Sequence, residues 1–162
     1  MYKSSIETAL NPYKETKLYG RYITNVMIEP LLKNLPDHAQ VLVEGMSVKK
    51  QPIYSITLGT GKKRILLWSQ MHGNESTTTK ALFDVLNTFK GQPEILESCT
   101  LLIIPILNPD GAEAYTRFNA DNIDLNRDAQ ALSQPESVIL HTCFTRFQSP
   151  WATHYLQCWK HL

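Results

Sequence analysis

The sequence has little of three things: cysteine, an excess of either charge, and long apolar runs. Its three cysteines, Cys99, Cys143 and Cys158, are odd in number and lack CxxC spacing, which argues against a disulfide framework or a zinc knuckle and favours reduced thiols. The 16 Lys and Arg residues nearly balance the 15 Asp and Glu residues, and a net charge of +1 gives no electrostatic reason to bind nucleic acid or an anionic membrane. Residues 1–18 contain no apolar stretch able to act as a signal peptide or membrane span, so we expect a cytoplasmic protein.

The length of 162 residues corresponds to about one domain. A chain of this size buries roughly 70% of the surface that it exposes when unfolded, so a metal is not needed merely to hold the fold together. The sequence contains no internal repeat, low-complexity tract or interdomain linker. We therefore expect one continuous domain over residues 1–162.

Apolar residues change between helical and strand-like spacing along the chain. Helices are expected over residues 21–35, 76–89 and 134–147. Pro30 predicts a bend or restart in the first, and Ser133 with Glu136 has the spacing of a capping box at the start of the last. Strands are expected over residues 41–46, 53–58, 65–68 and 101–104. Strands that alternate with helices predict an α/β fold.

Two polar segments directly follow expected strands. Residues 71–76 read Met-His-Gly-Asn-Glu-Ser, and residues 107–111 read Leu-Asn-Pro-Asp-Gly, which predicts a turn. In open α/β sheets, ligands bind beyond the carboxyl ends of the strands. We therefore expect these two segments to converge in one cleft.

A third segment, residues 124–127, reads Asp-Leu-Asn-Arg, and the three segments in this order resemble the zinc carboxypeptidases of the M14 type from about residue 66 to residue 130. The resemblance implies a mixed, largely parallel sheet flanked by helices, and one zinc ion held by two histidines and a glutamate. The matching ligands are His72 and Glu75. Taken alone, a His-x-x-Glu pair is a weak signal; the ordered set is much stronger.

The third zinc ligand implied by the family is a histidine near the end of a later strand. Among the candidates, His141 lies inside an expected helix, and we favour His154 over His161 because it follows a Ser-Pro-Trp segment and fits a strand end. An ordinary surface histidine is the alternative for His154.

The resemblance also assigns the substrate side of the site. Asp124 would orient a zinc-bound histidine, Arg117 would stabilise the oxyanion, and Asn126 with Arg127 would bind the free carboxylate of a peptide. A turn aspartate and surface salt bridges are the structural alternatives for these residues.

The chain departs from the family pattern after Arg127. It continues with Asp-Ala-Gln, and the only later glutamate, Glu136, falls at an expected helix start, so the general base of the family has no counterpart. We expect an incomplete family domain with a poorly matched tail over residues 149–162. The leading hypothesis is a zinc metallocarboxypeptidase domain, of the kind that hydrolyses C-terminal peptide bonds, which is inactive because it lacks the general-base glutamate. The alternatives are a zinc amidohydrolase resembling aspartoacylase and succinylglutamate desuccinylase, acting on N-acyl amino acids, and a non-catalytic carboxylate-binding module. Each would bind a peptide or small molecule with a free carboxylate.

Overall fold

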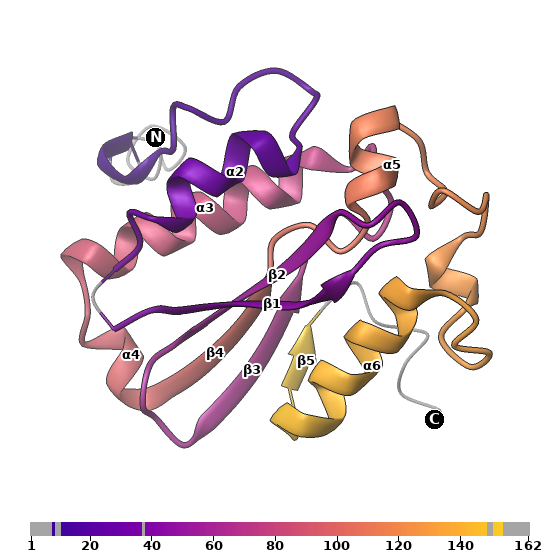
Figure 1. Cartoon of the computed structure of the whole chain (residues 1–162). Helices are drawn as coiled ribbons and strands as arrows, with labels where there is room; N and C mark the ends of the chain where they lie inside the picture. Colours follow the sequence, from indigo (N-terminus) through magenta and orange to yellow (C-terminus); the bar gives the residue numbers. More distant parts are fainter. Residues whose placement is uncertain (1–7, 9–10, 37, 149–150, 154–162) are drawn as a thin grey trace.

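The computed structural model describes residue 8 and residues 11–36, 38–148 and 151–153 (Figure 1). Five strands form one sheet in the order β1-β2-β4-β3-β5. The strands are β1 (Gln40–Met46), β2 (Pro52–Leu58), β3 (Lys63–Trp68), β4 (Cys99–Ile104) and β5 (Trp151–Thr153). The helices are η1 (Asn11–Tyr13), α2 (Asn25–Leu32), α3 (Ser76–Gly91), α4 (Ile95–Ser98), α5 (Pro109–Ala114), η2 (Leu125–Arg127) and α6 (Pro135–Phe147).

The sheet is mixed, which confirms the predicted fold class. β1 and β4 pair with β2 in antiparallel fashion, whereas β3 pairs in parallel with both β4 and β5. The parallel part of the sheet is therefore confined to β4, β3 and β5. In the β3 and β4 pair, Trp68 lies opposite Ile104, so both strands end at the same edge.

Helices cover both faces of the sheet (Figure 1). α2 and α3 lie on one face, and α6 lies on the other. Alternate residues of β4 serve the two layers: Leu101 and Ile103 pack in the cluster below α3, and Leu102 and Ile104 pack in the cluster with α6. This double burial explains why the strand reads as a continuous apolar run.

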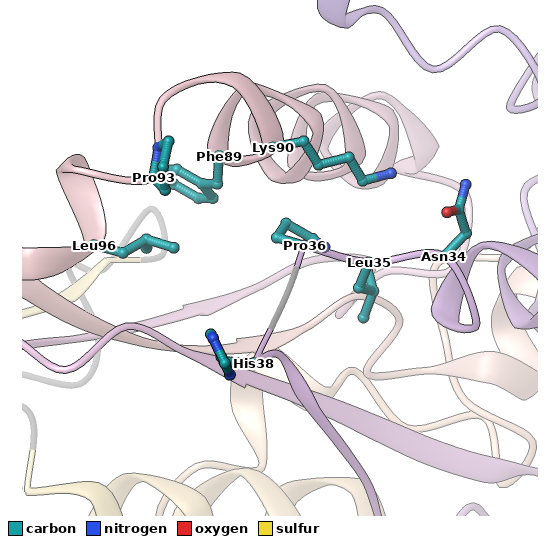
Figure 2. Close-up of a pocket in the computed structure, with 8 residues that line it drawn as sticks. All are labelled: Asn34, Leu35, Pro36, His38, Phe89, Lys90, Pro93 and Leu96. Carbon is teal, nitrogen blue, oxygen red and sulfur yellow. The ribbon is translucent and has the colours of Figure 1, made fainter.

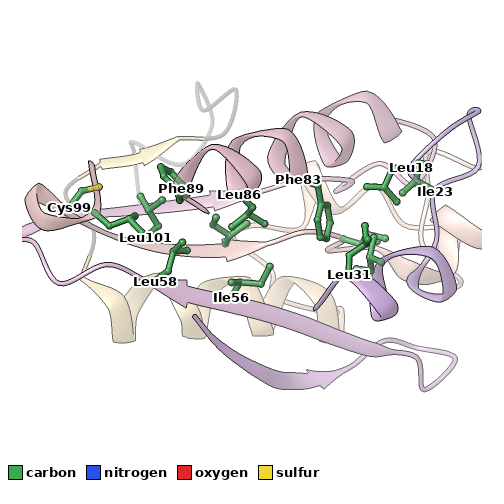
Figure 3. Close-up of a cluster of buried hydrophobic side chains, with 14 of the residues drawn as sticks. Leu18, Ile23, Leu31, Ile56, Leu58, Phe83, Leu86, Phe89, Cys99 and Leu101 are labelled. Carbon is green, nitrogen blue, oxygen red and sulfur yellow. The ribbon is translucent and has the colours of Figure 1, made fainter. Parts of the chain in front are cut away.

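α3 packs on the sheet through Phe83, Leu86 and Phe89, which are at most 6% exposed (Figure 3). They point toward Ile56, Leu58 and Leu101 of the sheet. Burial of each such side chain contributes about 1.5–3 kcal/mol. Val85 fits the apolar spacing that predicts a helix over residues 76–89, but it is 41% exposed in the structure.

The first expected helix is shorter than predicted. α2 begins at Asn25 and continues through Pro30, so the proline marks no restart. Its buried residues are Asn25, Ile28 and Leu31, while Val26 points away from the core and is exposed.

Two of the cysteines, Cys99 and Cys143, are free thiols, and both are buried. Burial, together with the charge of Glu44, raises the pKa of the Cys143 thiol to about 12. Cys158 lies outside the described residues. In the part of the chain that the structure describes, no helix has the length and apolar character needed to cross a membrane.

Candidate active site

The segments that follow β3 and β4 run out of the sheet side by side. Backbone hydrogen bonds join Ser69 N to Ile104 O, Leu107 N to Ser69 O, and Asn108 N to Gln70 O, each at 3.0 Å. The two motif segments predicted to converge are therefore neighbours.

Asn108 begins a short helix where a turn was predicted. Its Oδ1 accepts a hydrogen bond from Gly111 N at 2.8 Å, and Pro109 occupies the first turn of α5. Its Nδ2 donates to Met71 O at 3.3 Å, so one side chain caps α5 and also holds the other motif segment. An asparagine cap followed by proline is a favoured helix start, and this could have been inferred from the sequence.

Gly73 and Gly111 bring the two segments into backbone contact. A Cβ atom at Gly73 would lie 1.9 Å from the carbonyl carbon of Gly111 and 2.2 Å from Ala112 N. No side chain larger than a hydrogen fits there unless the backbone moves.

Gln70 supports the same segment from within the protein. The residue is 2% exposed and has a left-handed backbone with φ of 43°. Its Nε2 donates to Gly73 O at 2.8 Å and to Ile23 O at 3.1 Å, and its Oε1 accepts from Thr79 Oγ1 at 2.6 Å. No sequence motif marks Gln70, because its role depends on bonds to three separate segments, one of which, at Ile23, is 47 positions away.

His72 stands between two carboxylates. The ring is buried, with Nδ1 at 2.9 Å from Glu75 Oε1 and Nε2 at 3.1 Å from Asp124 Oδ1. The Glu75 side chain is half exposed, whereas that of Asp124 is mostly buried. Three of the predicted site residues, 52 positions apart at most, are thus brought together.

Asp124 links His72 to Arg117. Its Oδ2 accepts from Arg117 Nε at 3.1 Å and Nη2 at 3.0 Å, and its Oδ1 also accepts from Asn126 N at 3.0 Å. Burial by itself would raise the pKa of Asp124, but the hydrogen bonds from Arg117, Asn126 and His72 and the charge of Arg117 outweigh it and lower that pKa. An ionised Asp124 can accept the proton of Nε2, and in that tautomer Nδ1 carries the lone pair that a metal ion bound between His72 and Glu75 would need.

This arrangement fits half of a zinc site. Two ligands at about 2.1 Å from a tetrahedral zinc ion lie roughly 3.4 Å apart, so the Nδ1 to Oε1 separation of 2.9 Å needs only a small shift to admit the ion. Among the described residues, no cluster of three or more His, Cys, Asp or Glu side chains is placed to hold a metal ion. The favoured third ligand, His154, and the alternative His161 lie outside the described residues; His141 lies within α6.

Arg127 and Asn126 lie in η2, which Asp124 caps. Arg127 is exposed, and within the described residues its side chain forms no hydrogen bond or ion pair. Asn126 is connected to the histidine through its backbone N–H, which binds the same Asp124 oxygen as His72. Asn126 and Arg127 therefore lie in the same short segment as Asp124, the residue whose carboxylate contacts His72.

Glu136 is not a capping-box residue and does not reach the site. Gln134 is the N-cap of α6, and its side chain makes no capping hydrogen bond. Ser133 lies one residue earlier, and its Oγ donates to Asp128 Oδ1 at 2.6 Å. Glu136 is 0% exposed and accepts hydrogen bonds from Val48 N at 3.3 Å and Asn119 Nδ2 at 3.2 Å. The predicted capping box is wrong because α6 has Gln134 rather than Ser133 as its N-cap, while Ser133 binds Asp128 of the preceding loop and Glu136 binds Val48 and Asn119.

A cavity at the far end of α3 is separate from these residues (Figure 2). It is lined by Asn34, Leu35, Pro36, His38, Phe89, Lys90, Pro93 and Leu96. None of the predicted site residues lines it, so it is not the site predicted from the sequence.

Comparison with known proteins identifies a family. The family model described as zinc carboxypeptidase matches residues 24–158. Among curated proteins, the chain is 32% identical over 96 residues to Probable carboxypeptidase 2 of Arthroderma benhamiae, an alignment that covers 57% of this chain and 18% of that protein. It is 35% identical over 79 residues to Gamma-D-glutamyl-L-diamino acid endopeptidase 1 of Lysinibacillus sphaericus, covering 41% of this chain and 20% of that protein.

Solved structures show the same fold. A metallo-carboxypeptidase from Burkholderia cenocepacia superposes with a TM-score of 0.74 at 20% identity, covering 80% of this chain and 40% of that chain. The murein-tripeptide amidase MpaA from Escherichia coli O157 gives a TM-score of 0.58 at 20% identity, covering 69% and 58% respectively. The chain thus spans less than two thirds of the length of each of these proteins.

Proposed function

The chain belongs to the zinc carboxypeptidase family, and from this premise we propose that it forms the zinc-binding and carboxylate-binding part of a metallocarboxypeptidase acting on substrates with a free C-terminal carboxylate. The observation that carries the proposal is the position of His72 between Glu75 and Asp124, with Asp124 in turn bound by Arg117.

In this proposal, His72 Nδ1 and Glu75 Oε1 are zinc ligands, and His154 is the third. Support for His154 comes from its place in the chain directly after β5, whose last residue, Thr153, pairs with Leu67 beside the end of β3. Asp124 holds the proton of His72 on Nε2. Zinc bound there would polarise the scissile carbonyl and lower the pKa of a bound water.

Arg117 is proposed to stabilise the negative charge that develops on the substrate carbonyl oxygen. Its Nε and one Nη2 hydrogen are occupied by Asp124, which fixes the plane of the guanidinium beside His72. Nη1 is left to meet an oxyanion. A donor that is already held in place costs little reorganisation when the charge appears.

Asn126 and Arg127 are proposed to bind the terminal carboxylate. The planar guanidinium of arginine matches a carboxylate with two parallel hydrogen bonds, and the amide of asparagine can add a third. The exposure of Arg127 and its lack of an ion pair within the described residues support this role, because the guanidinium does not first have to leave an acidic partner.

No described carboxylate is assigned the role of proton shuttle. Glu136 is enclosed between Val48 and Asn119, and Glu75 and Asp124 are already engaged with His72. Loss of general-base assistance typically lowers a rate by about 10²–10⁴-fold. We therefore expect binding of metal and carboxylate to be easier to detect than turnover.

The test is metal analysis combined with calorimetry. The purified wild type is expected to retain zinc after dialysis, and a His72→Ala, Glu75→Ala double variant is expected to lose it. Equal zinc content in the two proteins would refute the metal site.

Calorimetry with a short peptide and its C-terminal amide tests the carboxylate site. The wild type is expected to prefer the acid, and Arg127→Ala should remove that preference at a cost of about 0.2–1 kcal/mol, because Arg127 is exposed and a solvated pair contributes less than a buried one. Arg127→Lys should recover little, since lysine keeps the charge but loses the fork. Equal binding of acid and amide by the wild type would sink the assignment.

A further inference from the structure

Two tyrosine side chains, one exposed and one half-buried, gather beside the loop that carries His72 and Glu75. The rings of Tyr22 and Tyr115 meet edge to face, with centroids 4.8 Å apart and an interplanar angle of 60°. The guanidinium of Arg21 lies 5.8 Å from the centre of the Tyr115 ring. Tyr22 is nevertheless 58% exposed, so this cluster does not serve the hydrophobic core.

The cluster is held against the site loop from both sides. Arg21 O accepts a hydrogen bond from Ser76 Oγ at 2.8 Å, next to Glu75. On the other side, Thr116 O accepts from Asn74 N at 3.1 Å, and Thr116 lies between Tyr115 and Arg117. The aromatic pair is therefore anchored to the backbone that places both proposed zinc ligands.

The backbone at Tyr115 is also unusual. Tyr115 ends α5 in the left-handed region, with φ of 54° and ψ of 45°. A bulky side chain there is disfavoured, and glycine or asparagine is the usual residue at such a position. The strained conformation places the Tyr115 ring against Tyr22 rather than against the core.

Aromatic residues that lie beside a cationic group and are accessible to solvent are typical of recognition surfaces. Tyrosine supplies a large contact area at low cost in conformational entropy, and such residues are enriched in binding hot spots. An extended peptide spans about 3.3–3.6 Å per residue, so a ligand of three to five residues whose last residue lies at the zinc site is long enough to reach side chains beyond the loop that carries His72 and Glu75. A single N-acyl amino acid is not.

We propose that Arg21, Tyr22 and Tyr115 form a recognition surface for the part of a peptide substrate that precedes its C-terminal residue, with preference for an aromatic side chain there. The inference rests on the proposed function and makes it more specific, because it assigns the site to an extended peptide rather than to a small N-acyl amino acid. The aromatic ring of the bound peptide would pack against the edge and face that the Tyr22 and Tyr115 rings present.

The test is calorimetry with alanine pentapeptides that end in a free carboxylate. One peptide contains only alanine, and three others carry a single phenylalanine at the second, third or fourth position. Phenylalanine at one of these positions is expected to tighten binding about threefold to tenfold, the range typical of one aromatic contact. The inference is overturned if no position tightens binding.

Three variants locate the effect. Tyr22→Ala is expected to abolish the gain from phenylalanine, so that the phenylalanine and all-alanine peptides bind this variant with equal affinity, and Tyr22→Phe is expected to preserve the gain. Tyr19→Ala is the matched control, since Tyr19 is also an exposed tyrosine, at 75%, but has no ring contact with Tyr115. Thermal melts of all variants should match the wild type. A gain that persists in Tyr22→Ala, or disappears in Tyr19→Ala, overturns the assignment.

The amide forms separate the two proposals. If the all-alanine acid and its amide bind equally, the proposed carboxylate site fails whatever phenylalanine does. If the acid is preferred and phenylalanine has no effect, only the aromatic surface fails. If the phenylalanine amide binds as tightly as the acid, the tyrosines are a docking surface unconnected with the site, which also overturns the inference.

Discussion

The two halves of the candidate site are built in opposite ways. The half that follows β3 and β4, with residues 69–76 and 105–111, is largely buried and is joined by backbone hydrogen bonds, by Gln70 and by glycine contacts that leave no space for a Cβ atom. The half that carries Arg117 and Arg127 is exposed at both arginines, and its inward contacts run through Asp124, through Asn119 and through the buried side chain of Leu125.

The difference shows how geometry and adaptability can be divided within one site. A metal ion needs ligands fixed within a few tenths of an ångström, which the packed backbone supplies. A substrate must enter and leave, which suits arginines on a solvent-facing loop. Mutations in the packed half should therefore lower stability first, while mutations in the exposed half should change binding with little loss of stability.

The largest effect is expected from Gly73→Ala, which breaks the packed half. The new Cβ would overlap the backbone of Gly111, and backbone cannot give way as a side-chain tip can. We expect the free energy of unfolding in urea to fall by at least about 3 kcal/mol.

Gly91→Ala is the control for this substitution. Its Cβ would meet the Tyr13 ring at 3.1 Å, a side chain that is able to shift, so we expect a change within about 1 kcal/mol. Similar losses in both variants would mean that the contact between the two loops is not what makes Gly73 special.

A smaller effect is expected from Asp124→Asn, which cuts the connection between the halves. Asparagine keeps the shape of the side chain but loses the charge that holds the proton on His72 Nε2 and pairs with Arg117. Zinc affinity, measured by competition with a chromogenic chelator, should fall about 10–100-fold.

Asp121→Asn provides a matched change in the same loop, because the Asp121 side chain is exposed and its hydrogen bond to Asn119 uses the backbone N–H. It should leave zinc affinity unchanged. Unaltered affinity in Asp124→Asn would show that Asp124 does not orient His72.

The smallest effect concerns Glu136, which supports the exposed half from below through Asn119. Burial, and to a lesser extent the charge of Asp110, raises the pKa of Glu136 above its ordinary value of 4.5, despite hydrogen bonds from its own backbone, Asn119 and Val48 that lower it. Between the unfolded and native pKa values the native state binds more protons, so the free energy of unfolding falls as the pH rises through this window.

Glu136→Gln should remove that fall, with a change at any one pH of at most about 1–2 kcal/mol, because glutamine keeps an acceptor for Val48 N–H. Urea unfolding measured across the acid range compares the two slopes. Glu97→Gln, an exposed glutamate in α4, should show the wild-type slope. A Glu136→Gln slope equal to that of the wild type would contradict the prediction.

The packed half of the site was largely predictable from the sequence, because strands and the motifs that follow them depend on residues that are close together in the chain. β3 and β4 were predicted because strands buried on both faces read as apolar runs, and the motifs at their ends were predicted to converge because of where such strands end. Helical apolar spacing also places Val26 and Val85 on the buried faces of their helices, yet both side chains are exposed. The spacing gives the direction of a buried face only approximately, and the element packed against the helix determines which side chains at its margin are covered.

The polar contacts were much less predictable. Gln70 binds Ile23 and Thr79, and Glu136 binds Val48 and Asn119, partners that only the tertiary fold brings together. The capping box at Ser133 and Glu136 failed partly for this reason: Glu136 binds Val48, far away in the chain, whereas Ser133 lies one residue before the N-cap and binds Asp128 in its own loop.

The long sequence separation of these contacts has a consequence for the order of folding. His72 and Glu75 are three residues apart and are present together on any unfolded chain, but Asp124 reaches His72 across 52 positions and Gln70 reaches Ile23 across 47. Contacts of such separation close late, because the loop entropy must be paid first. The ring orientation that suits zinc is therefore acquired only when the segment carrying the arginines has docked, and a partly folded chain should hold the metal weakly.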